Sequence, residues 1–180
     1  ERAATDFNYT PRETVKNSIH GRIGAIPARL TGYGEEWDED NCTLWCEGII
    51  SQGTVFGEHL ELRRRIEIDV GSDDIRLVDV VTNRGFYPTP HMFCYHINLG
   101  YPLLDGGSEY VAPIEDVIWA AHAGSKYQAQ DVGYQHLSAP SDQFHEQVWQ
   151  HQLAETIEGR SSVALLNDAA EIGFELEVNL

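Results

Sequence analysis

Residues 59–70, "HLELRRRIEIDV", decide the fold class of this chain because their side chains alternate strictly between two chemical types. One set of alternate positions is mostly aliphatic (Leu60, Leu62, Arg64, Ile66 and Ile68), and the other set is charged (Glu61, Arg63, Arg65, Glu67 and Asp69). Successive side chains of a strand point to opposite faces of a sheet, so this period of two predicts a half-buried β-strand. The segment "DDIRLVDVVTN" (73–83) follows the turn residues "VGSD" and predicts the second strand of a hairpin.

The same alternation recurs toward the C-terminus in "EQVWQHQLAETI" (146–157) and "FELEVNL" (174–180). Turn-forming segments, from "GYGEEWDED" (32–40) to "NDAAEIG" (167–173), punctuate the chain roughly every ten residues, which is typical of an all-β, antiparallel β-sandwich. One segment predicts a helix instead. In "IEDVIWAAHAG" (114–124), apolar residues fall at helical spacing and Gly124 is placed to end the helix.

Composition bounds the class of protein. The 180 residues suit a single domain over 1–180. With 29 acidic against 12 basic residues, the formal net charge is -17, which repels phosphate backbones and anionic membrane surfaces, so we expect no nucleic-acid and no membrane partner.

No apolar run approaches the length of a membrane-spanning helix. Cys42 and Cys46, about 13 Å apart on an extended strand, are too distant for a disulfide, and free thiols favour a cytoplasmic location.

The stretch "TPHMFCYHINLGYPLLD" (89–105) carries the main candidates for chemistry. If residues 91–99 form a strand, His96 and Asn98 share one face, and their short polar side chains suit a concave pocket better than a solvated surface. Tyr101 and Asp105 follow where Gly and Pro end the strand. Asp105 either caps backbone N–H groups in a turn or binds a substrate hydroxyl. A hydrogen-bonded structural histidine is the alternative for His96.

A second cluster lies upstream, in "SIHGRIGAIPARL" (18–30). His20 precedes glycines that allow a tight backbone, and Arg22 adds five N–H donors that suit a carboxylate or an array of hydroxyls. A solvated loop is the alternative for both residues. The histidines and cysteines show no spacing typical of a metal site, and no Gly-rich phosphate loop occurs, so we expect no metal and no cofactor.

The motifs "HGRIGAIPARL" and "VTNRGFYPTPHMFCYHINLGYPLLDGGS" resemble those of the aldose 1-epimerase (galactose mutarotase-like) superfamily, in particular a bacterial branch with an HGR loop and a YH-x-N-x-GYPLLD segment. The resemblance implies a large antiparallel β-sandwich, the galactose mutarotase-like supersandwich. It implies a sugar-binding role for His20 and places Asn98 at the Asn of the family's Asn-Leu pair. The acid histidine of the better-known mutarotases aligns with Cys94, and His96 lies two residues further, about 6 to 7 Å along the same face of a strand.

Members of the superfamily are longer than this chain, so the resemblance implies the central segment of such a domain and an incomplete sandwich. Open sheet edges and an uncovered apolar face then predict self-association, or pairing with complementary segments of the same protein.

The resemblance implies an aldose 1-epimerase that interconverts the anomers of a sugar or sugar derivative. His96 protonates the ring oxygen, a carboxylate removes the anomeric proton, and Asp105 and Glu146 are the candidates for that carboxylate. His20, Arg22, Asn98, Tyr101 and Asp105 are expected to bind the sugar. Two alternatives stay open: a carbohydrate-binding β-sandwich module without catalysis, and a metal-dependent sugar isomerase or lyase.

Overall fold

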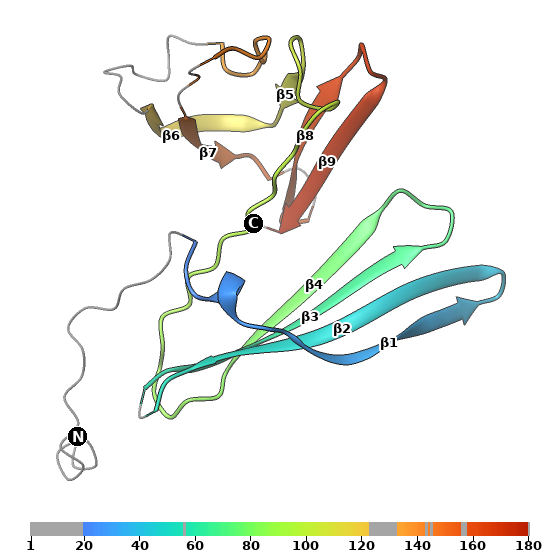
Figure 1. The fold of residues 1–180 in the computed structure, drawn as a ribbon, viewed down its shortest axis with the longest axis vertical. Helices are drawn as coiled ribbons and strands as arrows, with labels where there is room; N and C mark the ends of the chain where they lie inside the picture. Colours follow the sequence, from blue (N-terminus) through green and yellow to red (C-terminus); the bar gives the residue numbers. More distant parts are fainter. Residues whose placement is uncertain are drawn as a thin grey trace. The chain divides into compact units, whose positions relative to one another are not determined.

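The computed structural model describes residues 20–55, 57–122, 133–142, 144, 146–155 and 158–179. The chain forms two compact units, Glu1–Phe93 and Cys94–Leu180 (Figure 1). Every strand pair is antiparallel, and within the described ranges the only helix is the short 3₁₀ turn η1 (Ile23–Ala25). The all-β, antiparallel class predicted from the alternating patterns is therefore confirmed. The expectation of one domain over 1–180 stays a prediction.

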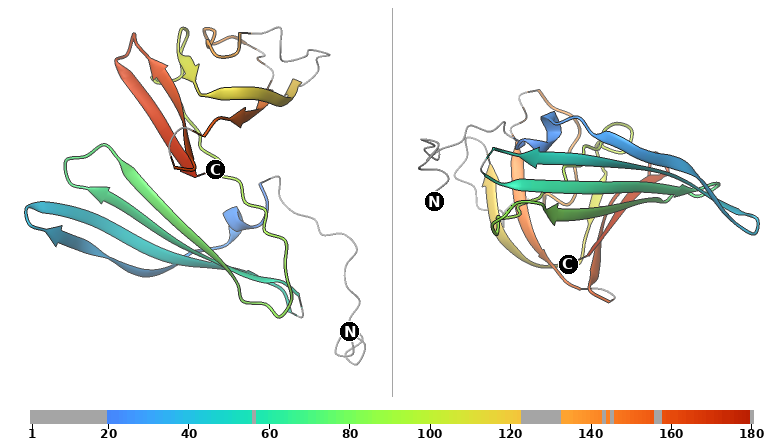
Figure 2. Two further views of the ribbon diagram at one scale, coloured as in Figure 1. Left: turned by 180° about the vertical axis from the view of Figure 1, so that it is seen from behind. Right: turned by 90° about the horizontal axis from the view of Figure 1, so that it is seen from below.

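The first unit holds a twisted four-stranded sheet whose strands follow one another in sequence order (Figures 1 and 2). The strands are β1 (Arg29–Asp38), β2 (Asn41–Gly53), β3 (His59–Asp69) and β4 (Ile75–Asn83). The predicted hairpin of residues 59–83 is confirmed as β3 and β4. Its turn is closed by the Ser72 N–H, which donates to the Asp69 carbonyl at 3.0 Å, while Gly71 supplies a positive φ of 87°.

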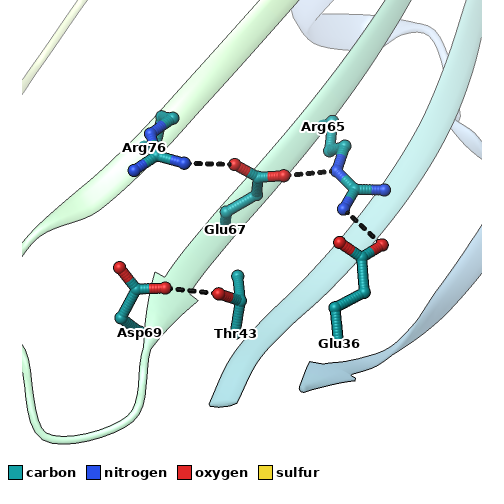
Figure 3. Close-up of polar contacts among 6 residues, drawn as sticks. All are labelled: Glu36, Thr43, Arg65, Glu67, Asp69 and Arg76. Atoms are coloured by element: carbon teal, nitrogen blue, oxygen red, sulfur yellow. Dashed lines mark hydrogen bonds and ion pairs between the residues drawn. The ribbon is translucent and has the colours of Figure 1, made fainter. Parts of the chain in front are cut away.

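One face of this sheet carries charged side chains that form ion pairs within and between its strands (Figure 3). Arg65 on β3 donates to Glu36 on β1 at 2.9 Å and to Glu67 on its own strand at 2.6 Å. Arg76 on β4 donates to Glu67 at 2.9 Å, so one carboxylate receives two guanidinium groups. The pKa of Glu67 is lowered, first by its hydrogen bond to Arg65. Glu67 and Arg76 lie directly opposite each other on β3 and β4, so this pair supports the register of the two strands.

The same face holds Trp45 of β2, whose indole lies against two glycines of β1. A Cβ atom added at Gly32 would come within 2.9 Å of the indole, and one added at Gly34 would lie 3.6 Å away. The Arg65 guanidinium lies over the indole, 4.3 Å from the ring centroid. The prediction of a turn at "GYGEEWDED" (32–40) was wrong, because residues 32–38 belong to β1 and only Glu39 and Asp40 turn the chain. The glycines make room for an aromatic ring from the neighbouring strand.

The opposite face of the sheet is apolar and partly exposed. Leu62 of β3 is buried, at 5% relative exposure, whereas Ile66 and Ile68 of the same strand are each 37% exposed. Tyr33 and Trp37 of β1 reach 76% and 64%. The aliphatic face predicted for residues 59–70 therefore exists, but among the described residues its burial decreases toward the C-terminal end of β3.

The second unit contains two small sheets. Strands β5 (Glu109–Val111), β8 (Arg160–Asn167) and β9 (Ile172–Asn179) form one sheet in the order β5-β8-β9, and β6 (Ile114–His122) pairs with β7 (Gln147–Leu153) (Figure 1). β7 confirms the strand predicted from "EQVWQHQLAETI" for residues 147–153 but not for 146, 154 and 155, and β9 confirms the strand predicted from "FELEVNL". Residues 156, 157 and 180 lie outside the described residues. Leu103 and Leu165 are buried at 7% exposure each.

The predicted helix at 114–124 was wrong, because residues 114–122 form strand β6. Residues 123 and 124 lie outside the described residues. The register of β6 against β7 shifts twice, between Ile114 and Asp116 and between Val117 and Trp119. Each irregularity adds a residue to one strand and breaks the period of two. The apolar side chains of a strand with two such shifts can fall at spacings that imitate a helix, which accounts for the wrong prediction.

Candidate functional site

The HGR loop lies in the first unit, just before η1. His20 is exposed, and Arg22 is partly buried. The Arg22 guanidinium donates to Glu58 at 2.6 Å, and the Thr54 hydroxyl donates to the other oxygen of the same carboxylate at 2.9 Å. The hydrogen bond from Arg22 is the main cause of the lowered pKa of Glu58. Arg22 thus ties the loop to the turn between β2 and β3, so one of its donor groups is already engaged by protein.

The predicted strand at 91–99 was wrong, because these residues form neither helix nor strand. Pro88 and Pro90 precede the segment and Pro102 follows it, and a proline has no N–H to donate to a sheet ladder. The argument that His96 and Asn98 share one face of a strand therefore no longer applies. Both side chains are nevertheless exposed, as are Tyr95 and Tyr101. The segment presents polar and aromatic groups at the surface of an irregular stretch of chain.

Residues 100–108 fold into a turn that is fixed by buried polar groups. Ser108 is fully buried, and its hydroxyl donates to the Leu103 carbonyl at 2.7 Å and accepts the Asp105 N–H at 3.1 Å. The Asp105 carboxylate accepts the N–H of Gly106 at 2.7 Å. This last contact is the backbone cap that the sequence offered as one of two roles for Asp105. A turn with so many internal bonds holds its residues in one conformation.

Asn167, at the end of β8, joins this turn to the sheet of the second unit. Its side chain is 5% exposed, and its amide nitrogen donates to the Pro102 carbonyl at 2.7 Å. Its amide oxygen accepts the N–H of Ala170 at 3.2 Å, within the β8–β9 turn. Pro102 adjoins Tyr101, which is 83% exposed. The hydrogen bond from the buried Asn167 therefore holds the backbone next to the exposed Tyr101.

A cluster that the sequence did not single out lies in the second unit around His151 of β7. The Tyr134 hydroxyl lies 2.7 Å from Nε2 of His151, and the Tyr110 hydroxyl lies 3.4 Å from Nδ1. The Tyr134 ring also stacks on Trp149, with 4.3 Å between centroids. Trp149 and His151 alternate on β7, so they share one face of the strand. The only sequence signal for this cluster is the alternation in "QVWQHQL" (147–153).

Burial sets the protonation of this cluster. It lowers the pKa of His151, and it raises the pKa values of Tyr110 and Tyr134. A nearby Tyr134 adds a smaller electrostatic contribution to the shift of Tyr110. In each case, burial disfavours the charged form of the group. The imidazole and both phenols are therefore neutral at neutral pH, and the hydrogen bonds between them join neutral groups.

The predicted site residues belong to different units. His20 and Arg22 lie in the first unit, and His96, Asn98, Tyr101 and Asp105 lie in the second. Within the second unit, the order of the chain brings His96, Asn98, Tyr101 and Asp105 together in one irregular segment and the turn that follows it. The structure adds Ser108 and Asn167, which fix that turn, and neither residue was predicted.

No group of three or more histidine, cysteine, aspartate or glutamate side chains in the described part of the chain is arranged to hold a metal ion. The three cysteines are free, as their spacing predicted. Within the described ranges, no helix is long and apolar enough to cross a membrane.

Comparison with known proteins gives one match. The model of the family described as "Domain of unknown function (DUF4432)" matches residues 3–180. The chain belongs to this family. No curated protein and no solved structure matches the chain. The DUF4432 match covers the HGR loop, the 89–105 segment and the Tyr–His cluster alike, so all three belong to the region that defines the family.

Proposed function

We propose that this DUF4432 protein is an aldose 1-epimerase-like enzyme that interconverts the anomers of a sugar or sugar derivative. The observation that carries the proposal is the segment 94–105, where an exposed imidazole, an exposed amide and an exposed phenol (His96, Asn98 and Tyr101) follow one another without regular structure. Hydroxyl-rich ligands are recognised by such polar and aromatic groups, and polar groups are disproportionately functional when loops present them. The buried Ser108 and Asn167 support the proposal because they hold the turn below Tyr101 in place.

In the proposed reaction, His96 donates a proton to the ring oxygen as the bond between C1 and that oxygen breaks. A base removes the proton of the anomeric hydroxyl, C1 becomes a carbonyl carbon, and rotation about C1–C2 precedes ring closure to the other anomer. Histidine is the side chain most often used as a general acid or base, because its imidazole can both give and take a proton. Asn98 and Tyr101 bind hydroxyl groups of the sugar. No redox step occurs, and the proposal names no metal or cofactor.

The test is exchange between anomers of free aldoses at equilibrium, measured by magnetisation transfer in NMR, with and without purified protein. The proposal predicts that exchange of at least one aldose accelerates in proportion to protein concentration. Binding of a sugar with no acceleration would favour the carbohydrate-binding module instead. Acceleration that is lost on treatment with a chelator and restored by metal would favour the metal-dependent isomerase.

A further inference from the structure

The second unit holds an imidazole with a phenol at each ring nitrogen. Tyr134 approaches Nε2 of His151 at 2.7 Å and Tyr110 approaches Nδ1 at 3.4 Å. The rings are also stacked, with centroids 5.4 Å apart for the Tyr134 pair and 5.6 Å apart for the Tyr110 pair. The three groups come from β5, β7 and the segment that begins at Gly133, so the arrangement is tertiary and not an accident of neighbouring residues.

The two distances indicate which nitrogen of His151 holds the proton. A neutral imidazole has one N–H and one lone pair, so one phenol must donate to it and the other must accept from it. Hydroxyl donors form the shorter bonds, near 2.7–2.8 Å, and N–H donors form longer ones. The short contact therefore fits a Tyr134 hydroxyl that donates into a bare Nε2, and the long contact fits an Nδ1–H that donates to the Tyr110 oxygen. In this tautomer Nε2 can accept a proton through Tyr134.

The surroundings keep that imidazole neutral. On β6 its cross-strand neighbour is Val117, and on its own strand the residues of the same face are Trp149 and Leu153. The polar groups recorded against its ring are the two phenols. Burial lowers the pKa of His151 and raises that of Tyr134, which favours a neutral acceptor and a protonated phenol before any ligand is present.

The proposed epimerase needs a base, and the carboxylates expected from the sequence are poorly suited to it. Asp105 already accepts a backbone N–H at 2.7 Å in its turn. Glu146 is exposed, outside any strand. We propose that Tyr134 and His151 form the proton acceptor for a sugar hydroxyl, with Tyr134 in contact with the hydroxyl and His151 as the final holder of the proton. This inference rests on the proposed function for the identity of the reaction.

The anomeric hydroxyl transfers its proton to the Tyr134 oxygen while the Tyr134 proton passes to Nε2 of His151. The electron pair left on the anomeric oxygen forms the C1 carbonyl, the bond to the ring oxygen breaks, and the ring oxygen takes the proton of His96. Ring closure reverses each transfer. Tyr110 accepts the Nδ1–H throughout and so fixes the tautomer, which makes it a positioning residue.

A purely structural role is the competing explanation, because the cluster also joins the two-stranded β6–β7 sheet to the sheet that contains β5. Tyr134→Phe separates the two explanations, since it keeps the ring that stacks on Trp149 and removes only the hydroxyl. His151→Gln removes the proton acceptor, and Tyr110→Phe removes the positioning contact at Nδ1.

The first measurement is independent of activity. The ¹⁵N shifts of the His151 imidazole in the full chain are expected to show the Nδ1–H tautomer, and the Nε2–H form should gain population in Tyr134→Phe. A wild type in the Nε2–H tautomer would overturn the relay, because Nε2 would have no lone pair to accept a proton.

The second measurement is anomer exchange against pH. Loss of the relay should lower kcat by about 10²-fold or more in Tyr134→Phe and His151→Gln, with little change in KM. Tyr110→Phe should lower kcat by a smaller factor, because it leaves the acceptor in place but no longer fixes its tautomer. The acid limb of the kcat profile should disappear in His151→Gln. Variants that lower the melting temperature but keep kcat and its acid limb would overturn the relay and leave the proposed function intact. A wild type that exchanges no anomers would overturn the proposed function, while the tautomer would still decide the relay.

Discussion

The Arg65 guanidinium lies 4.3 Å from the centroid of the Trp45 ring, and Gly32 of β1 approaches the same indole so closely that an added Cβ would lie 2.9 Å from it. Because Arg65 is held by Glu36 and Glu67, the indole has little room to move aside. We predict that Gly32→Ala destabilises the first unit by about 1–3 kcal/mol. Gly34→Ala is the matched control, since its Cβ would lie in ordinary contact at 3.6 Å. Thermal melts monitored by tryptophan fluorescence should separate the two variants, and equal melting temperatures would contradict the packing described for Trp45.

The anchor at Asn167 predicts a local effect on the turn that carries Tyr101. Asn167→Asp keeps an oxygen for the Ala170 N–H but removes the donor to the Pro102 carbonyl. A lost buried hydrogen bond costs about 1–3 kcal/mol, so amide hydrogen exchange at Leu104 and Ser108 should accelerate. Asn179→Asp, at an exposed position on β9, is the control. Unchanged exchange in Asn167→Asp would show that the turn holds itself without the asparagine.

Some strands of the two units could be predicted from the sequence, and others could not. Alternation with a period of two made β3, β7 and β9 predictable, and the turn residues after β3 predicted β4. It could not reveal β6, where two register shifts against β7 disrupt the pattern. It could not explain Gly32 and Gly34 either, because their reason is an indole on the neighbouring strand. The irregular pattern of β6 and the two glycines of β1 are explained by contacts with the neighbouring strand. Such contacts cannot be inferred from the sequence of one strand alone.

The candidate site was predictable only in part. His96, Asn98 and Tyr101 stood out as polar groups in an apolar run, and the structure leaves them exposed. Their expected strand was wrong, because the surrounding prolines cannot take part in a ladder. The contact of Tyr134 with His151 was not predictable, since 17 residues separate the pair in sequence. Asn167 and Pro102 are 65 residues apart, so their hydrogen bond carried no local signal either.

The ion pair of Arg22 with Glu58 predicts coupling between the HGR loop and the β2–β3 turn. Arg22→Gln and Glu58→Gln should each lower the unfolding free energy by about 1 kcal/mol, because the pair is only partly buried. The double variant should be little worse than either single variant, as measured by chemical denaturation. Additive losses in this cycle would mean that the two side chains act independently.

Burial of His151 predicts a specific pH dependence of stability. Its folded pKa is lowered from the ordinary value of 6.5, so the unfolded chain binds a proton more readily. The stabilising contribution is present above pH 6.5 and is lost as the pH falls through the folded pKa. Glu58 and Glu67 also have lowered pKa values, but their contribution is lost only below their ordinary value of 4.5. Denaturation curves of wild type and His151→Gln should therefore diverge above pH 6.5 and converge below it. A constant difference at every pH would contradict the assignment.

The proton transfer proposed from His96 to the sugar ring can be tested by anomer exchange in His96→Ala. General acid catalysis contributes about 10²- to 10⁴-fold, so kcat should fall by that factor, with a smaller change in KM. His91→Ala is the control, because that exposed histidine lies in the same irregular segment, stacked on Phe93. We expect near-wild-type exchange for His91→Ala and a loss of at least about 10²-fold for His96→Ala. Equal, wild-type kcat values in both variants would contradict it.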